Sequence, residues 1–549
     1  MDMKKIINKL LYTVAASGLL ITSSCTKKIE EAYLNPNAQV KQPIEQLLPG
    51  IIANMVVSAS ANGNFYGIQR DGTYIGRYIQ NFAQNGTGNQ YDQMGDNFVN
   101  GSDLLGDVWA MHYYGHGQNI SRIIEWGTEE KKWDYVGVAH AIRAWGFLTV
   151  ADIHANAIIV TEAFRPDLLT FKYNEQQEGY QETIRLSRLA IDYLSRTGDG
   201  VSQANLALGD KYFNNGDVNK WKKFVYGVMA RAFHRYSNKA EYAPDSVVKY
   251  CDLAMQTNAE NANVTWSGAG LAGTFSWYSP TRGNVNGLRQ GRFIANLMSG
   301  INSMFLTNTV DPRAAYIIRE NPNGTYKGIR PNRGADGLVA ADQPDNFFGG
   351  IFSSTASPAN DNNTRYVFKN TPIWPIMTAS EIQFLKAEAL LRKGGNAGAA
   401  HAAYVKALNL HFDQLISDYQ VSVPASRQIT PTSRDAFFAN PINVPPVGSL
   451  TLSHVMMQKY IALYIWGVIE TWVDMRRYHY TDLDPITNQQ VYNEFTLPTG
   501  TDLYIRNLGK PTYRLRPRFN SEYLYNTDEL NRVGAFAQDY ITVRPWFAE

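Results

Sequence analysis

Paired helical segments constrain the fold of this chain more than any other feature of its sequence. The clearest segment begins at Thr378, which forms a capping box with Glu381, and its apolar residues keep helical spacing as far as Gly394 and Gly395. A second helical stretch, 397–410, follows this short break. Because helices joined by short connections pack as antiparallel neighbours, the two segments are predicted to form a helical hairpin.

Similar stretches occur along most of the chain. Helical spacing predicts one pair over 133–153 and 174–195, another over 221–236 and 245–255, and a last strong helix over 453–477. No strict repeat of about 34 residues is visible, yet successive pairs favour stacked hairpins. We therefore predict a mainly α fold, in which stacked tetratricopeptide-like helical hairpins form a scaffold with long loop-rich segments and a few short β-hairpins.

A loop-rich insert interrupts the helical pattern over about 260–375, where Gly, Asn and Pro are frequent. Two shorter zones of the same kind are 61–106 and 411–450. Their many aromatic residues argue against disorder. Long loops inside compact proteins are usually functional, so these zones are where a binding site is expected.

The first 24 residues are predicted to be a secretory signal peptide. Lys4, Lys5 and Lys9 precede an apolar run over 10–21, which is too short to span a bilayer as a helix. Cys25 then follows three small residues and resembles the lipobox of bacterial lipoproteins, whose cysteine is acylated, although Thr22 stands where that box prefers Leu. An ordinary signal peptide with a chance cysteine is the alternative.

These features predict a domain organisation. We expect a lipoprotein signal peptide over 1–24, a lipid-anchored N-terminal tether over 25–44 and a single globular domain over 45–549. No later stretch reads as long and apolar enough to be a transmembrane helix, so a lipid on Cys25 would be the membrane anchor.

Charge and motifs exclude several classes of function. The chain has 51 basic and 49 acidic residues, and the predicted signal peptide carries the small basic excess, so nucleic acid is not an expected partner. Neither a nucleophile elbow nor a phosphate-binding loop is present. Cys251 lies in an apolar helical stripe and is expected to be a buried, inert thiol. We predict a binding protein that is not an enzyme and needs no cofactor.

Two clusters of polar residues could carry chemistry but favour simpler roles. His112 and His116 are spaced like two zinc ligands, yet they lack the Glu of metalloprotease helices, so core histidines are favoured and no metal site is predicted. Glu470 and Asp474 could suggest paired glycosidase carboxylates. Arginines at 476 and 477 favour structural ion pairs instead.

Landmarks in consistent order along the chain resemble the SusD/RagB-type outer-membrane lipoproteins, most closely the SusD-like, starch-binding-associating subset. The most specific are an Asn-Pro-Asn segment at 35–37 and a Glu-x-Trp-x-Asp-x-Arg-Arg signature at 470–477. The others are 47–52, 141–145 with Asp152, 173–174, 217–221 with Arg231, 377–388 and 517–526. One departure is the turn 154–157, which reads His-Ala-Asn-Ala where relatives often have Gly-Asp-x-Pro.

The resemblance implies a function and a location. Such a protein would be lipid-anchored to the cell outer membrane through Cys25 and face the exterior. It would bind a nutrient, most often an oligosaccharide, and deliver it to a SusC-like TonB-dependent transporter. A peptide-binding RagB-like protein is the alternative, and a surface glycosidase or protease is a third hypothesis from a different class.

A sugar ring offers an apolar face that stacks on aromatic side chains and hydroxyls that polar side chains bind. Residues of both kinds cluster in the loop-rich insert and in the segment after the first helix, where the family's sites usually lie. The predicted ligand-binding residues are Trp266, Trp277, Tyr278, Arg282, Tyr74, Tyr78 and Tyr91. The competing interpretation is that these aromatic residues only pack the loops onto the helices.

Overall fold

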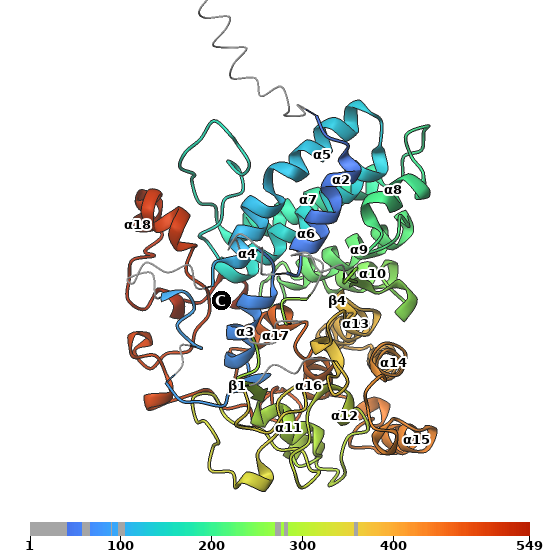
Figure 1. The fold of residues 1–549 in the computed structure, drawn as a ribbon, viewed down its shortest axis with the longest axis vertical. Coiled ribbons are helices and arrows are strands. Elements are labelled where there is room, and N and C mark those ends of the chain that lie inside the picture. The colour runs from blue at the N-terminus through green and yellow to red at the C-terminus, as the bar shows by residue number, and fades with distance from the viewer. Residues whose placement is uncertain are drawn as a thin grey trace, which may run out of the picture. The chain divides into compact units, whose positions relative to one another are not determined.

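A computed structural model describes residues 41–57, 66–88, 91–96, 105–268, 276–278, 284–355 and 361–549. Ile44–Glu549 forms one compact unit, in which helices dominate (Figure 1). The predicted signal peptide, Cys25 and the tether up to residue 40 lie outside the described residues. The α-helices and one π-helix are α2 (Ile44–Asn54), α3 (Gln69–Tyr78), α4 (Asp107–Ala110), η2 (Met111–His116), α5 (Gly117–Glu129), α6 (Trp133–His154), α7 (Gln176–Tyr193), α8 (Gln203–Asp210), α9 (Val218–His234), α10 (Pro244–Leu253), α11 (Arg292–Met298), α12 (Ala314–Ile317), α13 (Ala379–Lys393), α14 (Ala397–Tyr419), α15 (Pro431–Ala439), α16 (Leu452–Ala462), α17 (Val468–Arg477) and α18 (Thr527–Arg532).

Three helical hairpins form the scaffold: α6 with α7, α9 with α10, and α13 with α14. They stack in chain order, because α7 packs against α9 and α10 packs against α13. Each hairpin was predicted as a pair from the spacing of apolar residues, although α14 continues to Tyr419, beyond the predicted end at 410. The mainly α fold of stacked hairpins is confirmed.

Helix α6 is the central element of this stack. It contacts α5, α7 and α9, and nearly all of its residues are buried. By length and composition it could cross a membrane, so the prediction that no such stretch follows Cys25 is wrong. In its most apolar window 94% of the residues are buried inside the protein, which makes α6 a core helix of the stack.

The predicted helix over 453–477 is wrong in one respect, because it is two helices, α16 and α17. Between them Ile465 adopts a φ of 71°, and its backbone N–H donates a 3.0 Å hydrogen bond to Oδ1 of Asn81. The segment between the helices is apolar and buried, so its composition does not differ from that of a helix. The side chain of Asn81, which is distant in sequence, binds the backbone at the break between α16 and α17.

The capping box predicted at the start of α13 is half formed. Thr378 Oγ1 accepts a 3.1 Å hydrogen bond from the Glu381 backbone N–H, as expected. The Glu381 carboxylate does not return to the cap and instead accepts bonds of 2.6 and 2.7 Å from Arg231 of α9. A buried guanidinium that matches both oxygens is a stronger partner for this carboxylate than the backbone of Thr378.

Short antiparallel strands occur as predicted, but in the described part of the chain their partners are distant in sequence, so they do not form the predicted β-hairpins. β1 (Phe82–Gln84) pairs antiparallel with β3 (Leu288–Gln290), and β2 (Ala262–Val264) pairs antiparallel with β4 (Trp374–Met377). In register, Phe82 lies opposite Gln290 and Val264 lies opposite Trp374. The β1–β3 sheet therefore joins the insert to the segment after α3. The β2–β4 sheet joins the two ends of the insert to each other.

Two zones predicted as loops contain helices. The zone 61–106 holds α3, and the zone 411–450 holds the end of α14 and the whole of α15. Gly72 and Gly76 lower the helix propensity of α3. Tertiary packing requires them, since a Cβ would lie 2.9 Å from the Val468 side chain at Gly72 and 2.3 Å from the Phe82 ring at Gly76.

Candidate functional site

The partly exposed face of α3 is a short stripe of two arginines and a tyrosine. Arg70, Tyr74 and Arg77 are the residues of this helix that keep accessible surface, and the other seven are buried. Their spacing of four and three residues places them in one row along the helix. Asp71, on the buried side, accepts a 2.9 Å hydrogen bond from the backbone N–H of Val108 at the start of α4, which orients the helix.

Arg77 carries hydrogen-bonding capacity that the protein does not use fully. Its guanidinium carbon lies 4.5 Å from the centroid of the Tyr74 ring, and Nη1 donates a 3.1 Å bond to Gln84 Oε1. Its Nε is buried and has no hydrogen-bond partner within the described part of the chain. Burial lowers the pKa of Arg77 from its ordinary value. A ligand can reach this side chain only through the part of it that keeps accessible surface.

Gln69 joins this helix to the insert. Its Nε2 donates a 2.8 Å hydrogen bond to Ser276 Oγ, and its Oε1 accepts a 2.7 Å bond from the Trp277 backbone N–H. The Trp277 carbonyl accepts a further 2.6 Å bond from Asn284 Nδ2, and its indole stays partly exposed. The two segments proposed to share the ligand site are therefore in direct contact.

Three of the predicted ligand-binding residues are core residues in this conformation. Tyr78, Tyr91 and Tyr278 are at most 1% exposed. The Tyr278 ring stacks on Phe368 with centroids 5.5 Å apart, and the Tyr78 ring meets Tyr480 edge-on at 5.7 Å. Other residues cover these three tyrosines, so no ligand can touch them without a rearrangement.

The two remaining predicted residues are placed differently. Trp266 is partly exposed and lies just after β2, and its Nε1 is buried without a hydrogen-bond partner among the described residues. Arg282 lies outside the described residues. We use the name aromatic surface for Arg70, Tyr74, Arg77, Gln84 and Trp277.

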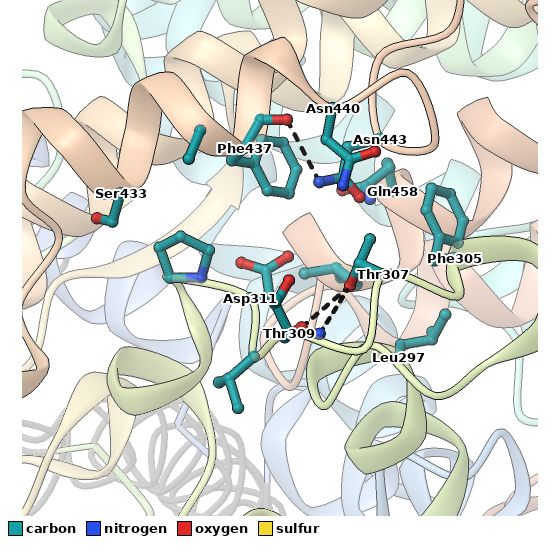
Figure 2. Close-up of a pocket in the computed structure, with 14 residues that line it drawn as sticks. Leu297, Phe305, Thr307, Thr309, Asp311, Ser433, Phe437, Asn440, Asn443 and Gln458 are labelled. Atoms are coloured by element: carbon teal, nitrogen blue, oxygen red, sulfur yellow. Dashed lines mark hydrogen bonds between the residues drawn. The ribbon is translucent and has the colours of Figure 1, made fainter.

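A cavity of about 210 Å³ lies elsewhere, between α15, α16 and the segment 305–312 that connects α11 to α12 (Figure 2). Its lining combines aromatic and aliphatic side chains with hydroxyls, amides and one carboxylate, Asp311. In Figure 1, α15 and α3 lie on different sides of α16. The cavity is therefore separate from the aromatic surface, and no residue in it was singled out from the sequence.

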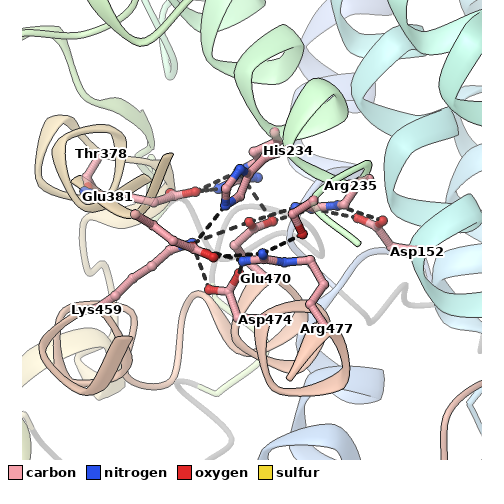
Figure 3. Close-up of polar contacts among 12 residues, drawn as sticks. Asp152, His234, Arg235, Thr378, Glu381, Lys459, Glu470, Asp474 and Arg477 are labelled. Atoms are coloured by element: carbon pink, nitrogen blue, oxygen red, sulfur yellow. Dashed lines mark hydrogen bonds and ion pairs between the residues drawn. The ribbon is translucent and has the colours of Figure 1, made fainter. Parts of the chain in front are cut away.

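The charges of the 470–477 signature belong to a buried network that connects α6, α9, α13, α16 and α17 (Figure 3). Arg235 binds both oxygens of Asp152 at 2.9 Å and donates a 2.9 Å bond to Glu470. Lys459 lies 2.7 Å from Asp474, and Arg477 binds both oxygens of Glu388 at 2.8 and 3.0 Å. We call these residues, with Arg231, Glu381 and His234, the charge network.

The charge network holds two of its carboxylates, Glu388 and Glu470, as paired anions. Burial alone would raise the pKa of Glu388, but Arg477 and His234 outweigh it and hold that pKa well below its ordinary value. Burial likewise opposes ionisation of Glu470, and Arg235, Arg231 and Lys459 together lower its pKa. Carboxylates with several fixed cationic partners stabilise packing between helices and are poorly placed to exchange protons with a substrate.

One arginine of the signature is not part of an ion pair, contrary to the prediction. Arg476 donates 2.8 Å hydrogen bonds to the carbonyls of Asp152 and Tyr513, and its guanidinium lies 3.7 Å from the Trp472 ring centroid. Burial lowers its pKa to about 10. Arg476 therefore binds backbone carbonyls of distant segments. The helical spacing of charges in the sequence does not indicate such partners.

His112, His116 and Cys251 are core side chains. His112 packs edge-on against Phe147 at 4.4 Å, and His116 Nε2 lies 3.0 Å from the Ile51 carbonyl. Burial lowers the pKa of His116 to about 3 and raises that of Cys251. Across the described ranges, no group of three or more His, Cys, Asp or Glu side chains is arranged to hold a metal ion.

Comparison with known families identifies the chain. A family model described as starch-binding associating with outer membrane matches residues 36–501. The chain belongs to the SusD-like family. No functionally curated protein matches this SusD-like chain.

Solved structures share the fold of this SusD-like chain. A SusD/RagB family protein from Bacteroides thetaiotaomicron is 20% identical, with a TM-score of 0.63 over 92% of this chain and 99% of that one. A SusD homologue from Bacteroides fragilis is 17% identical, with a TM-score of 0.62 over 92% and 100%. A Bacteroides vulgatus protein described as an outer membrane protein involved in nutrient binding is 16% identical, with a TM-score of 0.62 over 92% and 100%.

Sequence reasoning on this SusD-like chain missed Arg77 and Gln84, which belong to the aromatic surface, and Gln69, which connects its two segments. Gln84 lies on a three-residue strand and Gln69 is buried, so neither carries a local signal. Arg77 could have been found from its spacing to Arg70 and Tyr74, once the segment was recognised as a helix.

Proposed function

We propose that this chain is an outer-membrane lipoprotein that captures an oligosaccharide on the aromatic surface and delivers it to a SusC-like TonB-dependent transporter, without catalysing a reaction. A lipid on Cys25 would hold it at the membrane, facing the exterior. The description of its family and that of the Bacteroides vulgatus protein support this function.

The observation that carries the proposal is the hydrogen bonding of Gln69, which joins α3, the helix that carries Tyr74, to the backbone of Trp277. One buried amide thus connects the two segments that carry these partly exposed aromatic residues, and Arg77 lies beside Tyr74 and binds Gln84. Stacking on such rings recognises the apolar face of a sugar, and the guanidinium and amide can bind its hydroxyls. The ordered backbone of α3 and the Gln69 hydrogen bonds preorganise the surface.

A peptide is the alternative ligand. It would be recognised mainly through backbone hydrogen bonds in an extended groove. The row of aromatic and guanidinium groups on α3 offers side-chain contacts, which favours the sugar.

The experiment is calorimetric titration of the purified full chain with a panel of oligosaccharides and a panel of peptides. We expect a glycan to bind, and Trp277→Ala and Tyr74→Ala each to weaken that binding about tenfold or more, the effect of removing about 1.4 kcal/mol. Trp126→Ala is the matched control, since Trp126 is a half-buried tryptophan on α5 with Arg122 5.9 Å from its ring.

Three results would contradict the proposal. Peptides could bind in place of glycans, Trp126→Ala could weaken binding as much as Trp277→Ala, or the protein could hydrolyse a bound polymer by itself. Far-ultraviolet circular dichroism of each variant separates lost contacts from lost folding, and unchanged helical signal is expected for Trp277→Ala.

A further inference from the structure

We propose that the cavity beside α15 is a second binding site, which takes a single neutral sugar unit independently of the aromatic surface. Its volume of about 210 Å³ lies below the 300–1,000 Å³ typical of sites for drug-sized ligands, so it suits one ring and not a chain. Exposed residues at its mouth, among them Val310 and Ala436, leave it open to solvent.

A buried arginine sets the orientation of the polar groups at the base of the cavity. Arg313, fully buried, binds Asp311 through Nε at 3.0 Å and Nη2 at 2.7 Å. Nη2 also donates a 2.7 Å bond to Gln458 Oε1. Because that oxygen is occupied, Gln458 must turn its amide nitrogen the other way, and within the described part of the chain no hydrogen bond engages that nitrogen.

A neighbouring amide has the complementary orientation. Asn443 is 8% exposed, and its Nδ2 donates a 3.3 Å bond to the Phe437 carbonyl, which leaves Oδ1 as an acceptor. Figure 2 shows Asn443, Gln458 and Asn440 grouped on one side of the cavity and Thr307 and Asp311 across from them. A fixed donor beside a fixed acceptor matches adjacent hydroxyls of a sugar, each of which can donate and accept.

The apolar part of the lining supplies a surface for the face of a ring. Phe437 lies in the wall, and its ring centroid is 4.9 Å from the Arg313 guanidinium, which fixes the ring from behind. Phe305 and Ile461 complete the apolar lining. A rigid aromatic side chain opposite a few oriented polar groups is the usual composition of a small-ligand site.

The charge of the cavity favours a neutral ligand. The Asp311 carboxylate is neutralised by Arg313, and burial beside Arg313 lowers the pKa of His411 well below its ordinary value, so that imidazole is uncharged. Arg434 of α15 binds Asp413 at 2.6 Å outside the lining. No net charge remains to attract an anion or a cation.

The test uses the full chain, a panel of neutral monosaccharides (glucose, galactose, mannose and N-acetylglucosamine) and a parallel panel of free amino acids, with saturation-transfer NMR and titration. We expect at least one monosaccharide to bind with a millimolar dissociation constant, since so small a ligand has few contacts. Ala436→Trp, which fills the mouth from an exposed helix position, should weaken that binding at least tenfold.

Ala439→Trp is the matched control, because Ala439 is exposed on the same helix and does not line the cavity. Binding should also survive Trp277→Ala, which separates this site from the aromatic surface. The inference is overturned if no monosaccharide binds, if amino acids bind in their place, or if Ala436→Trp binds as well as the unaltered chain. Loss of monosaccharide binding in Trp277→Ala would overturn it as well, since the sugar would then occupy the aromatic surface.

Discussion

Two arginines in this protein have opposite surroundings. Arg235, in the charge network, binds Asp152 and Glu470, and these carboxylates keep its pKa well above the ordinary value. Arg77, on the aromatic surface, has a tyrosine ring and one amide oxygen as neighbours, and burial lowers its pKa. The first arrangement uses all three guanidinium nitrogens to hold helices together, whereas the second places a guanidinium beside an aromatic ring on a partly exposed face. The same residue type thus distinguishes a scaffold from a binding surface.

The largest loss of stability is expected when Arg235 of the charge network is replaced. Arg235→Met leaves two carboxylates buried without their main partner, so the free energy of unfolding should fall by about 3–5 kcal/mol. Urea denaturation measures it. Arg532→Met is the control, because the Arg532–Glu529 pair on α18 is largely exposed and such pairs contribute about 0–1 kcal/mol. Equal losses in the two variants would show that the charge network has no special role.

A smaller effect tests whether paired charges also hold the loop-rich insert. Burial alone would raise the pKa of Glu320, but hydrogen bonds and charge from Arg365 outweigh it and lower the pKa from 4.5 to about 2. The folded state then binds protons less readily than the unfolded one. This group therefore stabilises the fold above pH 4.5 and loses that contribution as the pH falls towards 2.

Glu320→Gln should accordingly lower the free energy of unfolding at pH 7 by at most about 3 kcal/mol, and the difference from the unaltered chain should shrink below pH 4.5. Urea denaturation of both proteins between pH 7 and pH 3 measures this difference. The carboxylates of the charge network titrate in both proteins and cancel in the comparison. A difference independent of pH would mean that the Arg365 contact does not act through charge.

The smallest effect on stability is expected on the binding side. Arg77→Met removes a cation that has no carboxylate partner among the described residues, so the free energy of unfolding should fall by no more than about 0.5 kcal/mol. Glycan binding should nevertheless weaken about tenfold, because a ligand loses its guanidinium partner. Calorimetry and urea denaturation of the same preparation give both values. A loss of stability as large as that of Arg235→Met would place Arg77 in the scaffold.

Much of the fold followed from local patterns. The three hairpins were visible because the apolar residues of their helices keep helical spacing, and because Thr378 marks the start of α13 and Gly394 its end. Helix α3 was missed because Gly72 and Gly76 look unfavourable until the side chains of Val468 and Phe82 are placed against them. The break between α16 and α17 was missed because Asn81 creates it from a distant loop.

Part of the candidate site could likewise be predicted from the sequence, and part of it depends on tertiary contacts. Aromatic composition pointed to two segments that the structure brings into contact, and Tyr74 and Trp277 keep accessible surface there. Tyr78, Tyr91 and Tyr278 were indistinguishable from them in sequence, because exposure depends on which neighbours cover a ring. Gln69 could not be recognised at all, since its role exists only when residues 69 and 277 meet.

The sequence by itself determined the class of this protein: a helical-hairpin scaffold of the SusD-like family, because apolar spacing, caps and the order of motifs are local and survive in the linear chain. Only the tertiary structure decided which charges are paired, which tyrosines are covered and where cavities open. Those properties depend on contacts between residues far apart in the chain, and a linear pattern does not contain them.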